Sequence, residues 1–129
     1  MPVSALRLRD VRDVRARGAE VLGPIRGVLD DLEPQAIAAS DGRSELTMSN
    51  IGRRWWRARD ELLIFGAVDP SSEIGSAASS LADAVAATWT SIAALNQNVS
   101  SPDALSTAVE KHAAARRASD ELEQLLRRA

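Results

Sequence analysis

Cysteine and tyrosine are absent from this chain, and histidine, phenylalanine and lysine each occur once among its 129 residues. Without cysteine the chain can form no disulfide, thiolate nucleophile or cysteine-ligated zinc site, and a reducing, cytoplasmic setting fits this composition. The scarcity of aromatic residues argues against a β-sheet protein, because sheets favour aromatic and β-branched residues. Alanine, leucine and arginine are abundant instead, which favours helices and is typical of a high-GC bacterium.

A strong charge of one sign and a long hydrophobic run are also missing. The 16 basic and 18 acidic residues give a net charge of −2, so the chain has no overall field to attract a polyanion. Residues 84–102 lack charge and have the length of a membrane span, but their many Ser, Thr, Asn and Gln side chains make insertion costly. The N-terminal residues lack the apolar region of a secretory signal. We therefore expect a cytoplasmic protein with no membrane span.

Apolar residues recur at helical spacing in four segments, which we expect to be helices at residues 4–33, 44–67, 70–99 and 102–128. In the first segment the spacing alternates between three and four, as in a bundle helix. Pro24 interrupts that segment without shifting the pattern, which predicts a kink near Pro24 or a brief break with Pro24 restarting the helix as its first residue.

Proline also marks the ends of the predicted helices. Pro34 ends the first one, with a short helical turn expected at residues 36–39. Asp69 is a suitable cap before Pro70, and Pro102 is a suitable first residue of the last helix. The short joins between the later helices force antiparallel neighbours.

These features predict one all-α domain spanning residues 1–129, folded as an antiparallel up-down-up-down four-helix bundle with its first helix kinked near Pro24. The alternative is an open helical arrangement that completes its core by dimerising.

The residues needed for common enzyme chemistry are missing. His112 is the only histidine, and neither a G-x-S-x-G turn nor a phosphate-binding G-x-x-x-x-G-K loop occurs. Carboxylate-bridged metal bundles need Glu-x-x-His on two helices, whereas Val109 stands three residues before His112. We therefore predict a protein that is not an enzyme and has no catalytic residue, metal or cofactor.

His112 still falls on the apolar stripe of its helix. Counting outward from the helix joins places Met48, Trp89 and His112 in one layer of the core. This polar layer could be a small-ligand pocket or a pH-sensitive contact. The structural alternative is a histidine bonded to a backbone carbonyl, a hydroxyl or an acidic neighbour.

The stretch "NIGRRWWRARDELLIFGAV" combines two tryptophans with four arginines. Trp55 lies on the core stripe, whereas Trp56 is about 100° away and half exposed, within reach of an arginine that can stack on its ring. The candidate interaction residues are Arg53, Trp56, Arg57 and Arg59. A core tryptophan beside a solvated arginine edge is the structural interpretation, and a protein contact is the functional one. Asp60 and Glu61 disfavour nucleic acid.

We therefore expect a non-enzymatic helical interaction or accessory module that binds a protein partner or itself as a homodimer. The expected contact surfaces are the Arg/Trp edge of residues 44–67 and the weakly charged Ser/Ala side of residues 70–99. One alternative is a nucleic-acid-associated regulatory protein that uses the arginine-rich faces of the first two helices. Another is a small-ligand binder with a pocket near Trp89 and His112.

Overall fold

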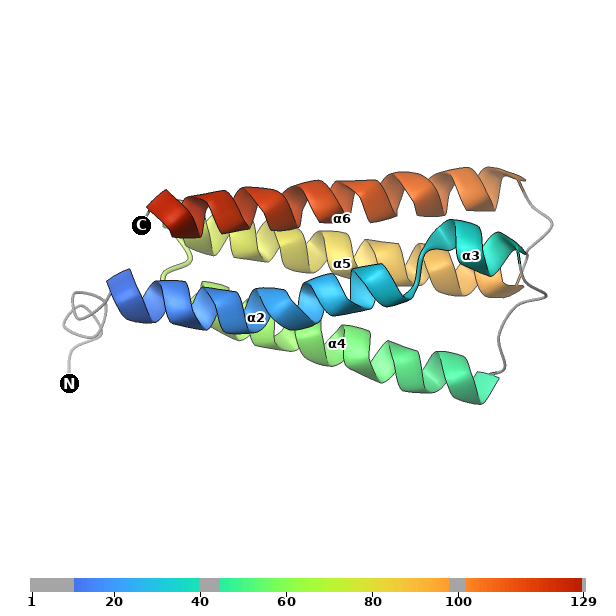
Figure 1. The fold of residues 1–129 in the computed structure, drawn as a ribbon, viewed down its shortest axis with the longest axis horizontal. Coiled ribbons are helices and arrows are strands. Elements are labelled where there is room, and N and C mark those ends of the chain that lie inside the picture. Colours follow the sequence, from blue (N-terminus) through green and yellow to red (C-terminus); the bar gives the residue numbers. More distant parts are fainter. Residues whose placement is uncertain (1–10, 40–44, 98–101, 129) are drawn as a thin grey trace.

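The computed structural model describes residues 11–39, 45–97 and 102–128, which are helical apart from two short connections. The helices are α2 (Val11–Asp31), α3 (Pro34–Ala39), α4 (Glu45–Ala67), α5 (Glu73–Gln97) and α6 (Pro102–Arg128). The four long helices run side by side with alternating direction (Figure 1). The predicted all-α, up-down-up-down bundle is therefore confirmed.

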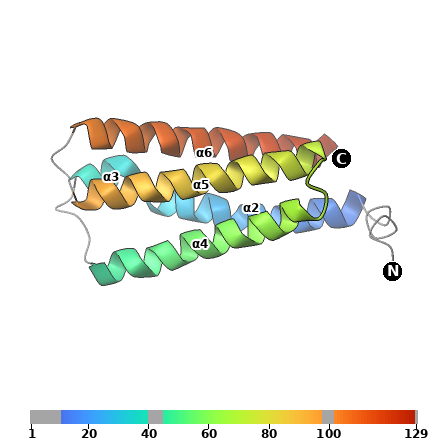
Figure 2. The ribbon, with the colours of Figure 1, turned by 180° about the vertical axis from the view of Figure 1, so that it is seen from behind.

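The long helices form a ring in which each packs against two neighbours. α2 packs against α4 and α6, and α5 packs against the same two helices from the other side. The short helix α3 crosses one end of the bundle and packs on α5 and α6 (Figures 1 and 2). The beginning of α4 diverges from the other helices at that end (Figure 2). Among the described helices, α4 is thus held mainly by α2 and α5.

The break in the first helical segment lies at residues 32–33 and not near Pro24, which corrects the predicted kink. α2 continues through Pro24, whose ring is exposed, so water can reach the backbone carbonyl that the proline leaves unpaired. Pro34 disfavours helical backbone at the preceding residue. The chain restarts at once, because the Glu33 carbonyl accepts hydrogen bonds from the amides of Ala36 and Ile37 at 3.1 and 3.3 Å.

α5 begins three residues later than the predicted start at residue 70. A turn closes first, with the Ser72 amide donating to the Asp69 carbonyl at 3.1 Å. The Ser72 hydroxyl then accepts a hydrogen bond from the Gly75 amide at 2.9 Å. Ser72 is therefore an N-cap of α5, in place of the predicted Asp69. The start of α6 at Pro102 agrees with the sequence.

The core runs along the axis of the bundle. Its largest fully buried apolar side chains come from all five described helices and from the break between α2 and α3, and they include Ile25, Leu29, Leu32, Ile37, Trp55, Leu62, Leu81, Ile92, Leu95 and Leu122. Burying each such side chain contributes about 1.5–3 kcal/mol, and this is the main term that holds the helices together. Ile37 extends the core to the end that α3 covers.

Candidate functional site

The single histidine lies in the core at the contact between α6 and α2. The Nε2 nitrogen of His112 lies 2.7 Å from the backbone carbonyl oxygen of Leu29, so Nε2 carries the hydrogen and donates it. Leu29 belongs to the last four residues of α2, whose carbonyls have no partner within the helix. The contact therefore matches the structural alternative for His112, a histidine bonded to a backbone carbonyl.

Arg116, one turn after His112 on α6, also binds the C-terminal end of α2. Its guanidinium pairs with Asp30 at 2.7 Å and with Glu33 at 3.3 Å, and it also donates to the Leu29 carbonyl at 3.4 Å. Basic groups are favourable at a helix C-terminus because the exposed carbonyls there carry partial negative charge. His112 and Arg116 thus cap α2 from a neighbouring helix.

Trp89 packs against α4 rather than against the histidine. Its ring lies 5.8 Å from the ring of Trp55, centroid to centroid, at an angle of 40°. A Cβ atom on Gly52 would lie 2.7 Å from Trp89 Cζ2, so the glycine makes room for the indole. Met48, buried, precedes Gly52 by one turn of α4.

The three residues of the predicted polar layer therefore have different neighbours. Thr88 donates to the Lys111 carbonyl at 3.0 Å, which sets Trp89 and His112 at nearly the same level of the bundle. However, Trp89 faces α4 and His112 faces α2, and within the described part of the chain no hydrogen bond joins them. Each side chain is already engaged in helix packing.

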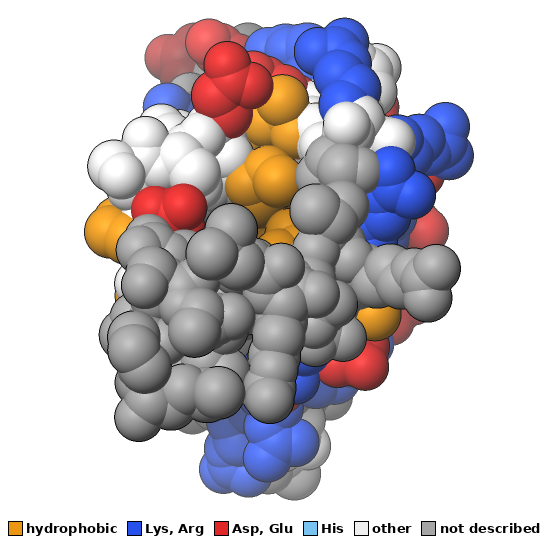
Figure 3. All heavy atoms as spheres, turned by 90° about the vertical axis from the view of Figure 1, so that its left-hand side faces the viewer, with side chains coloured by type: hydrophobic (Ala, Val, Ile, Leu, Met, Phe, Trp, Pro, Cys, Tyr) orange, Lys and Arg blue, Asp and Glu red, His pale blue; other side chains and the backbone are white. Residues whose placement is uncertain are grey.

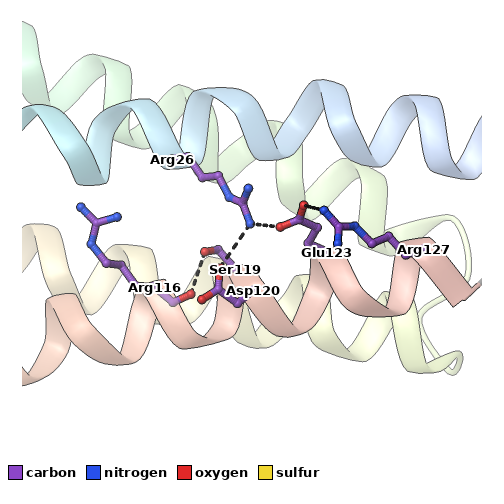
Figure 4. Close-up of polar contacts among 6 residues, drawn as sticks. All are labelled: Arg26, Arg116, Ser119, Asp120, Glu123 and Arg127. Atoms are coloured by element: carbon purple, nitrogen blue, oxygen red, sulfur yellow. Dashed lines mark hydrogen bonds and ion pairs between the residues drawn. The ribbon is translucent and has the colours of Figure 1, made fainter.

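A network of charged side chains follows the α2–α6 contact on the surface (Figure 4). Arg26 of α2 pairs with Asp120 at 3.3 Å and makes a closer pair with Glu123. Glu123 also accepts a hydrogen bond from Arg127 at 2.8 Å. The two arginines, of which Arg26 has the larger effect, hold the pKa of Glu123 below its ordinary value of 4.5. The network joins α2 to α6 at the surface.

The arginines of α2 whose contacts are described bind groups of α6 or of α2 itself. Arg15 donates to the carbonyl oxygens of Leu126 and Arg127, both at 3.1 Å, near the end of α6. Arg17 pairs with Glu20 at 3.3 Å within its own helix. Among the described arginines of α2, Arg17 and Arg26 thus have acidic partners, and Arg15 binds backbone carbonyls of α6.

The outer face of α4 carries the large apolar side chains that are exposed in the described part of the chain. Trp56 and Leu63 are each 38% exposed, Ile64 is 65% exposed, and Val68, just past the helix, is 56% exposed. We define the outer face by its exposed residues Arg53, Trp56, Arg57, Asp60, Glu61, Leu63, Ile64 and Val68. Apolar side chains gathered on one face mark an interaction site more often than scattered ones do.

The predicted stacking of an arginine on Trp56 is present and involves Arg59. The Arg59 guanidinium carbon lies 4.5 Å from the centre of the Trp56 ring. An Arg59 nitrogen also lies 2.9 Å from an Asp60 carboxylate oxygen. These contacts hold the Trp56 ring in one orientation at the surface, where an exposed cation–π pair contributes about 0.5–1 kcal/mol.

Three charged side chains on this face have no ionic partner in the described part of the chain. Arg54 pairs with Asp31 of α2 at 2.7 Å. By contrast, Arg53, Arg57 and Glu61 are exposed and make no side-chain ion pair or hydrogen bond there. The sequence thus identified Arg53, Trp56, Arg57 and Arg59, and the structure places all four on or beside one surface.

Sequence reasoning missed Ile64, the most exposed large apolar residue of this face. A signal for it exists, because Ile64 follows Trp55 by nine residues and so lies about 180° around the helix from that buried ring. An isoleucine opposite a core tryptophan points away from the core that the tryptophan enters, so it is exposed unless another element or another chain covers it.

The end of the bundle that holds the start of α5 and the end of α6 contains a groove of about 580 Å³. The groove is lined mainly by serine and alanine, with Glu73, Glu121 and Arg128 among its charged residues. Figure 3 shows this end, with acidic and basic side chains around a small apolar area. Among the described residues no cluster of His, Cys, Asp or Glu could hold a metal ion.

Comparison with protein-family models, with curated proteins and with solved structures finds no match to this chain. No helix in the described ranges is long and apolar enough to cross a membrane. Function is therefore inferred from the geometry of the described residues.

Proposed function

We propose that this protein is a non-enzymatic helical interaction module, located in the cytoplasm, that self-associates through the outer face of α4. The observation that carries the proposal is the gathering of Trp56, Leu63, Ile64 and Val68 on a face that no described helix covers. Burying such side chains in a protein contact is favourable by about 25 cal/mol per Å² of apolar surface. Tryptophan and arginine, both present here, are the residues that most often dominate protein contacts.

The Ser/Ala side of α5, the second contact surface expected from the sequence, supports binding less well. Its exposed positions are small or polar, such as Ser79, Thr90 and Ala94. Little apolar area is therefore gained by covering them. The same positions provide matched controls for substitutions on α4.

A lysine at position 64 tests the proposed surface. We expect Ile64→Lys to raise the dissociation constant of the dimer about tenfold or more, which is about 1.4 kcal/mol, because a charge would replace buried apolar area. Ala94→Lys, the same change of residue at an exposed position of α5, should leave the dissociation constant unchanged. Sedimentation velocity over a range of concentrations measures both. A monomeric wild type at millimolar concentration, or equal effects of the two variants, would contradict the proposal.

Nucleic-acid binding through Arg53 and Arg57 is a second candidate, because these two cations have no ionic partner among the described residues. Asp60 and Glu61 on the same face oppose it, since they repel phosphates. A band shift with mixed-sequence DNA or RNA at about 50 mM salt, lost at higher salt, would favour this candidate over self-association.

A further inference from the structure

The outer face of α4 has two edges of different chemistry. Successive residues of an α-helix are about 100° apart, so residues seven or four positions apart lie on the same side. Trp56 and Leu63, seven apart, form an apolar edge, and Arg57 and Glu61, four apart, form a charged edge. The line between the two edges consists of Arg53, Asp60 and Ile64.

Two-fold symmetry restricts how two such faces can meet. In a symmetric dimer the same patch is used by both copies. If the two helices run antiparallel, the two-fold axis is perpendicular to both, and it brings each edge against the same edge of the other copy. The apolar edge then meets the apolar edge, and the charged edge meets the charged edge.

Both edges lead to the same alignment of the two helices. Trp56 opposite Leu63 places the axis between residues 59 and 60, and Arg57 opposite Glu61 places it at residue 59. The agreement to within half a residue means that one register satisfies the apolar pair and the charged pair together. Arg53 opposite Ile64 of the partner subunit would place the axis between residues 58 and 59, within one residue of this register, so the aliphatic part of the arginine can reach and cover the isoleucine.

We propose that two copies of this chain pair through α4 in antiparallel orientation, with the two-fold axis near residue 59. In this dimer Trp56 packs against Leu63 of the partner subunit, and Arg57 forms an ion pair with Glu61 of the partner subunit. Symmetry doubles each contact. The inference rests on the proposed self-association and adds to it the identity of the partner and the register.

The charge pattern favours this partner and this direction. Along the outer face the cations Arg53 and Arg57, which have no ionic partner among the described residues, come first, and the acidic residues Asp60 and Glu61 follow them. An antiparallel second copy therefore sets Arg57 against Glu61, while Asp60, which lies close to the axis, stays paired with Arg59 of its own chain. A parallel copy would bring Arg53 next to its own counterpart, where like charges oppose binding, and would set the charged edge of each copy against the apolar edge of the other.

Charge reversal in two separate chains tests the register. Arg57→Glu alone and Glu61→Arg alone should each raise the dissociation constant of the homodimer about tenfold, because both place like charges across the interface. An equimolar mixture of the two variants should form a heterodimer with nearly wild-type affinity. In the mixture the charges within each chain remain alike, so only contacts between chains can restore binding.

The control is Lys111→Glu, at an exposed position of α6. It changes the net charge of the chain as Arg57→Glu does, and it should leave association unchanged. Circular dichroism melts show that each variant is folded, and sedimentation equilibrium at low salt gives the dissociation constants. If the wild type forms a dimer that the reversals do not weaken, or that the mixture does not restore, the antiparallel register is wrong while self-association stands. If the wild type stays monomeric at millimolar concentration, both proposals fail.

Discussion

His112 illustrates how a polar residue is accommodated in this core. It lies on the apolar stripe of α6, and its ring donates to the Leu29 carbonyl at the end of α2. A buried carbonyl that loses its donor is destabilising, because it has also lost contact with water. The histidine therefore supports the end of α2, where Pro34 prevents the helix from continuing.

Two substitutions of His112 should distinguish the contribution of its hydrogen bond to stability from the contribution of its volume. We expect His112→Leu to lower the free energy of unfolding by about 1–3 kcal/mol, because the Leu29 carbonyl would lose its closest donor. His112→Gln, which keeps an N–H group at a comparable distance from the backbone, should lose less. Urea unfolding followed by circular dichroism measures both variants. Equal stability of the two would show that the hydrogen bond contributes little.

Glu123 should make stability depend on pH. Its pKa is lowered in the folded protein, chiefly by Arg26, so its ion pairs stabilise the fold at pH values above the ordinary pKa of 4.5. This stabilisation is lost as the pH falls and the carboxylate takes up a proton. The difference in unfolding free energy between wild type and Glu123→Gln should therefore shrink between about pH 7 and about pH 3.

Glu110→Gln is the matched control for this pH dependence, since Glu110 is exposed on the same helix and makes no ion pair in the described part of the chain. Its unfolding free energy should follow that of the wild type at every pH. A Glu123→Gln difference that stays constant down to pH 3 would show that the ion pairs with Arg26 and Arg127 do not contribute.

Contacts within one helix were easier to predict from the sequence than contacts between helices. The stacking of Arg59 on Trp56 follows from a separation of three residues, which brings two side chains together on any α-helix. The bond from His112 to Leu29 depends on how far α2 and α6 are shifted along each other. That shift is set by packing of the whole core, so the sequence indicated only that a carbonyl was one suitable partner.

Among the contacts between helices, the one between α4 and α5 depends on Gly52, whose lack of a side chain leaves room for the ring of Trp89. We expect Gly52→Ala to destabilise the protein by about 1–3 kcal/mol through overpacking against Trp89, although alanine favours helix by about 1 kcal/mol. Gly27→Ala, at a position where a Cβ would meet nothing within 4 Å, should stabilise the protein by about 0.5–1 kcal/mol. Thermal unfolding of both variants compares them, and stabilisation by Gly52→Ala would contradict the tight contact.

Helix ends were predicted correctly where a single residue, such as proline, determines the local backbone conformation. Pro34 and Pro102 act through a fixed geometry that needs no neighbour. Pro24 misled the prediction because a helix tolerates proline where water can satisfy the freed carbonyl, and exposure is a property of the packed fold. The start of α5 lies later than predicted because Ser72 and Asp69 are both suitable N-cap residues. The turn from Asp69 to Ser72 makes Ser72 the N-cap.

For the whole molecule, helical periodicity predicted four long helices, and short joins predicted that they alternate in direction. Periodicity identifies the face that each helix buries, but it does not say which helices are neighbours. The ring order, with α4 between α2 and α5, is what leaves the outer face of α4 uncovered. The sequence therefore indicated Arg53, Trp56, Arg57 and Arg59, while the extent of the surface around Ile64 required the fold.

The most direct test of the α4 interface uses the absence of cysteine from the chain. Asp60→Cys places one thiol beside the proposed two-fold axis, and Ala94→Cys places one on the exposed side of α5. We predict that a short bis-maleimide cross-linker converts Asp60→Cys into a covalent dimer at concentrations where Ala94→Cys remains monomeric. Cross-linking of both variants to the same extent, or of Ala94→Cys alone, would contradict the account.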